Sequence, residues 1–322
     1  MPAFPFIYAT HSGIVPNIEE DQTQEIQAVI DSLNQKAGII WFDPGIYKVT
    51  QLRLPIGVSI WGSGIASPPH TGTVFFQPNG VDKSLFINDP GQLGPTDYMH
   101  WNQFRNFAMR KEEPVIDTIG SGFDLSCRIG EGFDLSHIMA VGFPESGIKL
   151  RNGGEPAWGV HDIHCFRNGQ YGIDCNKGGG DAWFPLHLDK ISGDNNGKAL
   201  IRVGTVGNAH ETIHLSHIKS ESSDPGKQLD IIELFNVFAV NVTIEHLSGF
   251  GIQGVTGNNV IHLTGSSNAR VMGKSVYASN FNRLIRDDQR NVSVGLDNQR
   301  SEFMYSGGLL HWQLGNMGTM TP

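Results

Sequence analysis

Acidic residues recur beside aromatic residues in the middle of the chain, each time in a glycine-rich stretch. The set comprises Glu155 with Trp158, Asp181 with Trp183, and Glu211 with His210. Glycoside hydrolysis needs one carboxylic acid to protonate the leaving oxygen and a second carboxylate to activate water or attack carbon. We therefore expect the three acids to be catalytic and Trp158, Trp183 and His210 to bind a sugar chain. The alternative is that these residues only form turns and pack the coil edges.

A second polar set lies in the middle of successive short apolar segments. It consists of Asp174, Arg202, Glu233 and His262. An arginine between two carboxylates keeps both of them ionised, which suits structure or cation binding better than a general acid whose pKa must be raised. Arg202 and Glu233 are candidate substrate-binding residues, and mutual neutralisation of the charges is the alternative.

A third set carries acids next to histidines. Asp189 and Glu245 are expected at one outward position of neighbouring repeats, on either side of Ser216, and His217 and His246 each come one residue later. A carboxylate and an imidazole on adjacent strands can form an acid–base pair. Because each of these histidines precedes an apolar residue that points inward, a role in shaping a bend is the favoured interpretation.

The chain has thirteen histidines, which raises the question of a metal. His187 and His214 are expected on neighbouring repeats, but a zinc site needs three or four ligands in defined geometry. We therefore expect no metal and no cofactor for a hydrolase. A lyase would be compatible with calcium, for which Asp287 and Asp288 are the candidate ligands.

One helix is predicted near the start of the chain, over residues 21–36. Ile26, Val29, Ile30 and Leu33 recur there at helical spacing. Asp21 and Gln24 have the spacing of a capping pair. Short strands separated by glycine-rich turns follow from residue 38.

Two interleaved columns of apolar-x-apolar triplets then repeat every 23 to 31 residues, the period of a solenoid. Side chains alternate faces along a strand, so the apolar residues point into a core and the middle residues form ladders outside. A (β/α)8 barrel would need amphipathic helices between the strands, and the sequence has none. The first column is 123–125, 148–150, 173–175, 201–203, 232–234, 261–263 and 285–287; the second is 133–135, 158–160, 186–188, 213–215, 242–244, 269–271 and 292–294.

A resemblance to a known family rests on three stretches near the N-terminus. They are Asp21-x-Thr23-x-x-Ile26-Gln27-x-x-Ile30-Asp31, Gly38-x-Ile40-x-Phe42-x-Pro44-Gly45-x-Tyr47-x-Val49, and Ser59-Ile60-Trp61-Gly62-Ser63-Gly64. Here the chain resembles the pectate-lyase superfamily of right-handed β-helices, which includes many phage tailspike depolymerases. The resemblance implies an all-β, single-stranded right-handed parallel β-helix (solenoid) with an N-terminal capping α-helix. It also implies a homotrimer located in a virion tail or outside the cell.

The expected organisation is an N-terminal segment with the capping helix (1–55), the parallel β-helix (56–300) and a C-terminal cap or trimer-contact segment (301–322). With 322 residues the chain can bury a sizeable core. Cys127, Cys165 and Cys175 have no disulfide or metal pattern and are expected to be buried thiols. The first residues lack a signal peptide, so export is expected by cell lysis or a dedicated machine, if at all.

Composition and net charge limit the classes of partner that the chain can bind. The net charge of -9 argues against nucleic acid, and no apolar run reaches the ~18 residues that a membrane span requires. Three functions remain open. The leading one is a depolymerase that hydrolyses a bacterial surface glycan; the others are a lyase that cleaves a uronic-acid polymer by β-elimination, and a glycan-binding spike or adhesin without activity.

Overall fold

The computed structural model describes residues 5–33, 36–65, 72–153, 157–176, 186–204, 209–227, 230–252, 258–264, 268–281, 283–287, 293–296 and 303–306. Side chains are described in these ranges except at 151–153, 157–158, 176, 209–211, 238–241, 268–270, 272–275, 283–284, 287, 293–296 and 303–306.

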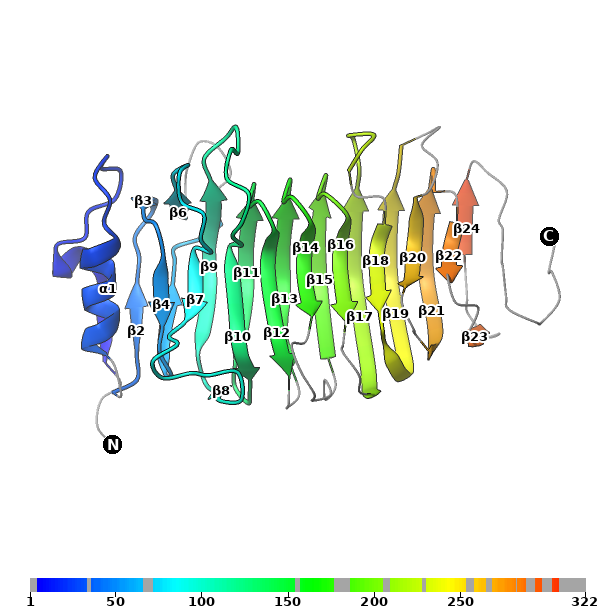
Figure 1. Cartoon of the computed structure of the whole chain (residues 1–322), viewed down its shortest axis with the longest axis horizontal. Coiled ribbons are helices and arrows are strands. Elements are labelled where there is room, and N and C mark those ends of the chain that lie inside the picture. Colours follow the sequence, from blue (N-terminus) through cyan, green and yellow to red (C-terminus); the bar gives the residue numbers. More distant parts are fainter. Residues whose placement is uncertain are drawn as a thin grey trace.

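The chain winds into a right-handed parallel β-helix, as predicted, in which strands one coil apart pair side by side (Figure 1). The strands form two parallel sheets. Sheet A contains β1 (Phe6–Tyr8), β2 (Gly38–Trp41), β3 (Gly45–Lys48), β5 (Val58–Trp61), β6 (Thr73–Gln77), β9 (Gln103–Lys111), β11 (Asp134–Val141), β13 (Ala157–Phe166), β15 (Leu186–Asp194), β17 (Ala209–Glu221), β19 (Phe238–Phe250), β21 (Asn268–Ser279), β23 (Ser293–Leu296) and β24 (Phe303–Ser306). Sheet B contains β4 (Leu52–Leu54), β7 (Phe86–Asn88), β8 (Tyr98–Met99), β10 (Phe123–Ile129), β12 (Ser146–Gly153), β14 (Tyr171–Asn176), β16 (Ala199–Gly204), β18 (Asp230–Phe235), β20 (Asn259–Thr264) and β22 (Arg283–Asp287).

The predicted helix is α1 (Thr23–Ser32), and it lies at the end of the solenoid where the chain begins (Figure 1). A 3₁₀ helix, η1 (Ala9–Ser12), precedes it. Ile26, Ile30 and Leu33 are buried and close the first coil. The capping contact differs from the predicted Asp21–Gln24 pair. Asp21 Oδ1 instead accepts hydrogen bonds from the amide and the hydroxyl of Thr23, because the helix begins two residues later than the sequence pattern indicated.

The first predicted column is confirmed as the inward face of sheet B. Its leading residues pair in one continuous row, Phe123, Ile148, Ile173, Ile201, Ile232, Ile261 and Ile285. The second column lies in sheet A, with two corrections. Ala157, not Trp158, pairs with Leu186, because the pairing of β13 with β15 shifts by a bulge between Ala157 and Val160. Val271 pairs with Val242, not with Ile244, because the pairing of β19 with β21 shifts by a bulge between Ala239 and Val242.

Strands of sheet A are longer than predicted because they turn a corner without ending. In the six coils from β9 to β19, one residue at the corner takes a left-handed backbone conformation, with φ between 51° and 63°. This bend row consists of Asn106, His137, Asp162, Lys190, His217 and His246. Asn, Asp and His tolerate this conformation better than most other residues, which explains why they dominate the row. The bend gives each of these six coils two outward faces within one strand.

The segment from 112 to 122 is an insertion between β9 and β10, and a buried charge anchors it. Lys111 is fully buried and forms an ion pair with Asp117. Its ammonium also donates to Gln77 Oε1 (3.1 Å) and to the carbonyls of Pro78 (2.9 Å) and Val81 (3.1 Å). All donors of the ammonium are thereby used, as burial of a charge requires.

The N-terminal segment hydrogen-bonds into both sheets, since β2 pairs with β5 and β4 pairs with β7. Cys127, Cys165 and Cys175 are buried and free, as predicted. In the described part of the chain, no helix is both long and apolar enough to cross a lipid bilayer.

Candidate functional site

A shallow groove lies on the outer face of sheet A, beyond the bend. Its walls come from β13, β15 and β17, and it has an empty volume of about 320 Å³. The lining residues are Phe166, Ser192, Gly193, Asp194, Lys219 and Glu221. A groove built on paired strands holds its side chains at fixed spacing, which is the property that a catalytic pair needs.

Two carboxylates form the centre of this groove. Asp194, the last residue of β15, pairs in register with Glu221, the last residue of β17. Phe166 precedes Asp194 in the same row and Phe250 follows Glu221. Each of the four lies four positions after the bend residue of its coil, so the row reads aromatic, acid, acid, aromatic along the solenoid axis.

The two acids have different surroundings. Burial raises the pKa of the Asp194 carboxyl, the positive charge of Arg167 opposes this, and the negative charge of Glu221 raises the pKa further. Glu221 forms an ion pair with Lys219, whose Nζ lies 2.9 Å from Glu221 Oε1. A carboxyl with a raised pKa beside a second carboxylate is the arrangement in which one acid can donate a proton and the other can attack.

The two phenylalanines offer apolar surfaces at the ends of the pair. The ring of Phe166 stacks with that of His164, with centroids 6.4 Å apart and planes at 10°. Phe250 is 40% exposed and contacts the ring of Tyr277 at 5.7 Å. Phe166 is half-buried and Phe250 is exposed, and an accessible ring face can pack against the apolar face of a sugar.

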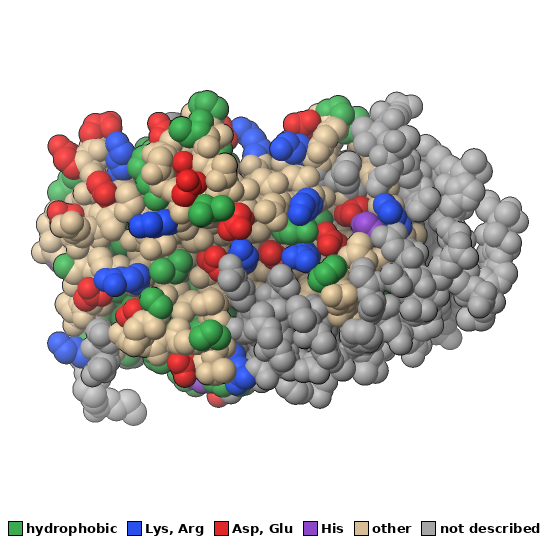
Figure 2. Space-filling model, in the orientation of Figure 1, with side chains coloured by type: hydrophobic (Ala, Val, Ile, Leu, Met, Phe, Trp, Pro, Cys, Tyr) green, Lys and Arg blue, Asp and Glu red, His purple; other side chains and the backbone are tan. Residues whose placement is uncertain are grey.

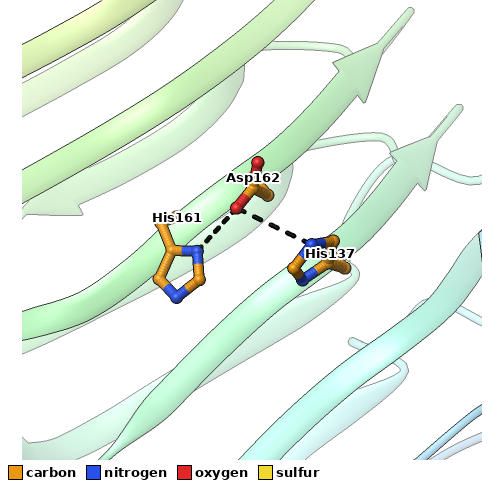
Figure 3. Close-up of side chains that lie close together, drawn as sticks. All are labelled: His137, His161 and Asp162. Atoms are coloured by element: carbon orange, nitrogen blue, oxygen red, sulfur yellow. Dashed lines mark hydrogen bonds and ion pairs between the residues drawn. The ribbon is translucent and has the colours of Figure 1, made fainter.

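A second cluster occupies the bend itself, on β11 and β13. The imidazoles of His137 and His161 both face the carboxylate of Asp162 (Figure 3). Asp162 Oδ2 lies 2.7 Å from His161 Nδ1 and 3.8 Å from His137 Nε2, and Lys190 Nζ is 3.6 Å from the same oxygen. Burial raises the pKa of Asp162, but the hydrogen bond from His161 and the charges of His137, Lys190 and His161 outweigh it, so the pKa is lowered.

The predicted Asp189 set lies where the sequence placed it. Asp189, Ser216 and Glu245 form one row of register partners, and His217 and His246 occupy the bend, with φ of 51° and 53°. Asp189 Oδ1 accepts hydrogen bonds from Ser216 Oγ (2.6 Å) and pairs with His217 Nδ1 (2.7 Å). The predicted role of the two histidines in forming the bend is confirmed by these angles.

His187 and His214 are neighbours, as predicted, with ring centroids 4.7 Å apart. Burial, followed by the charge of His214, lowers the pKa of His187 against the opposing charge of Asp189. The two rings meet edge to face, with their planes at 66°, on the outer face of β15 and β17.

The charged ladder on sheet B holds the remaining predicted residues. Arg202 lies 3.6 Å from Asp174 Oδ1 and 3.6 Å from Glu233 Oε1, and its guanidinium packs between the rings of Tyr171 and Phe235. The outward row on this sheet is Asp124, Lys149, Asp174, Arg202, Glu233, His262 and Arg286. Figure 2 shows acidic and basic side chains side by side along the middle of one face of the solenoid. Substrate binding by Arg202 and Glu233 stays a prediction.

The predicted catalytic acids are not placed by the structure. Glu155, Asp181 and Trp183 lie outside the described residues, as does Asp288. The side chains of Trp158 on β13, of His210 and Glu211 on β17, and of Asp287 on β22 also lie outside the described part. Their roles stay predictions.

Sequence reasoning missed the Asp194–Glu221 pair and the His137–His161–Asp162 cluster. The sequence Gly193-Asp194-Asn195-Asn196-Gly197 is typical of a turn, but Asp194 is the last residue of β15. A signal was available for the acids, because Asp194 and Glu221 each follow the first residue of their apolar triplets, Leu186 and Ile213, by the same number of positions.

A family model and two solved structures match this architecture. Residues 6–188 match the family described as "Rhamnogalacturonase A/epimerase, pectate lyase-like". No curated protein matches the sequence. The gp42 tailspike of Acinetobacter phage vb_AbaP_AS12 is 13% identical, with a TM-score of 0.56, over 94% of this chain and 58% of that chain.

The tailspike of Acinetobacter baumannii phage AM24 is also 13% identical, with a TM-score of 0.54, over 95% of this chain and 55% of that chain. The A-module of the mannuronan C-5 epimerase AlgE4 from Azotobacter vinelandii is 12% identical, with a TM-score of 0.43, over 96% of this chain and 100% of that chain. The chain therefore spans somewhat more than half the length of the two tailspikes, and at these identities the likeness concerns the fold.

Proposed function

The chain belongs to the rhamnogalacturonase A/epimerase, pectate lyase-like family, and we propose that it is a polysaccharide depolymerase that hydrolyses glycosidic bonds. The observation that carries this proposal is the pairing of Asp194 with Glu221 in an open groove between two aromatic rings. The substrate class is a bacterial surface glycan. The location is a virion tail, which the fold shared with two phage tailspikes supports.

Asp194 is the proton donor in this proposal. Its proton passes to the glycosidic oxygen as the bond to the anomeric carbon breaks, and the leaving sugar departs as an alcohol. Glu221 attacks the same carbon and forms a glycosyl ester. Water, deprotonated by the ionised Asp194, then cleaves the ester and restores both carboxyl groups.

The register between β15 and β17 fixes the spacing of the two acids, and this spacing predicts whether the configuration at the anomeric carbon is retained or inverted. Paired residues of neighbouring strands stand ~4.8 Å apart in the hydrogen-bonding direction. Retaining glycosidases place their carboxyl groups ~5–5.5 Å apart, whereas inverting ones need ~6.5–9.5 Å to admit a water molecule. Adjacent-coil acids therefore favour retention of configuration. Phe166 and Phe250 extend the row by one coil on each side, so the glycan runs along the solenoid axis.

A lyase is the second candidate, and the bend cluster is the observation that favours it. His161 is a potential base on this outer face, Lys190 is a cation beside it, and Arg105 is a cation one coil before His137. Elimination needs a base for the proton next to a uronate carboxylate and a positive group to neutralise that carboxylate. A glycan-binding spike without activity is the third candidate.

The deciding experiment incubates the protein with capsular and lipopolysaccharide glycans and follows reducing ends and the ultraviolet absorbance of unsaturated uronates in parallel. New reducing ends without absorbance are expected; absorbance would favour the lyase, and binding without either signal would favour the adhesin.

Sedimentation velocity on the same sample tests the homotrimer that the tailspike resemblance implies.

Single-residue variants then identify which acids are catalytic. Asp194→Asn and Glu221→Gln are each expected to reduce kcat by about 10²–10⁴-fold, while Glu19→Gln, a matched change at a fully solvated carboxylate, leaves it unchanged. Asp181→Asn and Glu211→Gln test the acids predicted from sequence. Full activity in both groove variants, with loss in the Asp181 or Glu211 variant, would move catalysis out of the groove.

A further inference from the structure

We propose that His137, His161 and Asp162 bind one divalent transition-metal ion, with Zn²⁺ as the best fit. The site is separate from the Asp194–Glu221 groove and does not depend on the proposed hydrolysis. It lies at the bend, where β11 and β13 run side by side (Figure 3).

The three potential ligand atoms already converge. One atom from each side chain lies within 4.8 Å of the others. Zinc bonds of ~2.0–2.2 Å in a tetrahedron separate neighbouring ligand atoms by roughly 3.3 Å. The separations of Asp162 Oδ2 from His161 Nδ1 (2.7 Å) and from His137 Nε2 (3.8 Å) bracket this value. Small side-chain rotations therefore bring these two pairs of atoms to the tetrahedral separation, and the third pair is already within 4.8 Å.

The backbone holds the ligands in this arrangement. His137 and Asp162 are register neighbours in the bend row, with φ of 52° and 54°, so both side chains leave the sheet at the corner. His161 directly precedes Asp162 on the same strand. A site carried by hydrogen-bonded strands is preorganised, unlike one assembled from loops.

The carboxylate of Asp134 lies beside the imidazole of His161, on the side away from Asp162. Asp134 Oδ1 lies 3.7 Å from His161 Nε2, and it is a buried oxygen that accepts no hydrogen bond from the described residues. Asp134 is held from its other side by Arg105. When His161 binds metal through Nδ1, its Nε2–H donates to this oxygen. Such a carboxylate–histidine–metal relay orients the ring and raises its basicity.

Ligand chemistry selects the metal. Two imidazoles and one carboxylate suit zinc, cobalt or nickel, whereas calcium requires six or more oxygens. Three protein ligands on partly exposed side chains leave a fourth position facing solvent, which is open to water or to an oxygen of a bound sugar.

Lys190 is the competitor for the same carboxylate, since its ammonium lies 3.6 Å from Asp162 Oδ2. Removal of this charge by Lys190→Gln leaves the ligands in place. The variant is therefore expected to bind metal several-fold more tightly, an effect that no purely structural role of Lys190 predicts.

The test titrates Zn²⁺ into the untagged, chelator-treated full chain by calorimetry and records the visible spectrum of the Co²⁺ form. We expect one ion per chain and the intense absorption of a four-coordinate cobalt site. His137→Asn, His161→Asn and Asp162→Asn should each weaken binding at least 100-fold, and Asp134→Asn about 10–100-fold.

His217→Asn is the matched control, because His217 is a bend residue hydrogen-bonded to Asp189 in the same way but is not part of the cluster. Unchanged thermal unfolding of each variant excludes misfolding as the cause of weaker binding. Absence of zinc binding, or binding that survives loss of His137 and His161, would overturn the proposal. Equal loss in His217→Asn would place the metal elsewhere on the histidine-rich face and would overturn it as well.

Discussion

Asp194 of β15 and Glu221 of β17 are register partners at the ends of their strands, each four residues beyond the bend of its coil. Strand pairing holds the two carboxyl groups side by side on the outer face. Like charges at this spacing resist simultaneous ionisation. Burial is the main cause of the raised pKa of Asp194, Arg167 opposes it, and the charge of Glu221 adds to it. This shift provides the first test of the groove.

The charge of Arg167 is expected to influence the pH at which kcat/KM falls on the alkaline side. Its positive charge lowers the pKa of Asp194, so Arg167→Met is expected to raise that pKa and move the alkaline limb of kcat/KM to higher pH. The profile of kcat/KM against pH measures this shift. Arg53→Met, at an exposed arginine on β4, is the control. An unshifted limb in Arg167→Met would mean that Asp194 is not the titrating acid.

The ionised carboxylate of Asp194 is expected to lower the free energy of unfolding at neutral pH. Its folded pKa lies above the unfolded value, so ionisation favours the unfolded state, and this penalty grows as the pH rises from the unfolded pKa through the folded pKa. Asp194→Asn should therefore raise Tm at pH 7 and have a smaller effect below pH 4. Scanning calorimetry at both pH values measures the difference. A lower Tm at pH 7 would contradict a destabilising charge at this position.

The buried Lys111–Asp117 pair is expected to be the charge contact most sensitive to truncation. Lys111→Met leaves Asp117 without its cation and should lower the free energy of unfolding by about 3–5 kcal/mol. Urea unfolding gives the value. The double variant Lys111→Met/Asp117→Leu should recover part of the loss, since no unpaired charge remains. A loss below about 1 kcal/mol in the single variant would mean that water reaches the carboxylate.

The same pair makes stability depend on pH. Burial raises the pKa of Asp117, but hydrogen bonds from Lys111 and from the amides of Gly80 and Val81, together with the charge of Lys111, lower it. A depressed folded pKa contributes stability that is present above the unfolded pKa and is lost as the pH falls through the folded value. The acid unfolding curve of Asp117→Asn should therefore be flatter below pH 4 than that of the natural chain.

Arg202 tests whether the ladder on sheet B binds substrate or only holds the coils together. Because Arg202 neutralises Asp174 and Glu233, Arg202→Met is expected to lower the free energy of unfolding by about 1–3 kcal/mol and to leave KM unchanged. Denaturant unfolding and glycan kinetics on the same variant separate the two roles. A rise in KM without loss of stability would assign Arg202 and Glu233 to substrate binding.

Much of the fold was predictable from sequence because its signals are local. The alternation of apolar and polar residues in triplets such as 201–203 and 232–234 identifies strands and their inward faces. The spacing of Ile26, Ile30 and Leu33 identifies the capping helix. Burial of Cys165 and Cys175 follows from their place in the same alternation.

The candidate sites depend on which coils become neighbours, and that depends on tertiary structure. Strict alternation from the inward Leu135, Leu186 and Ile213 would place His137, Asp194 and Glu221 on the inside. The left-handed residue at the bend of each strand shifts the alternation and turns these side chains outward. Loops of unequal length between coils then decide which outward side chains meet. The sequence column at 269–271 shows the difficulty, since one bulge shifts its pairing by two residues. Local periodicity therefore determines the solenoid and its core, whereas hydrogen-bond register between distant strands decides which acids and imidazoles share a site.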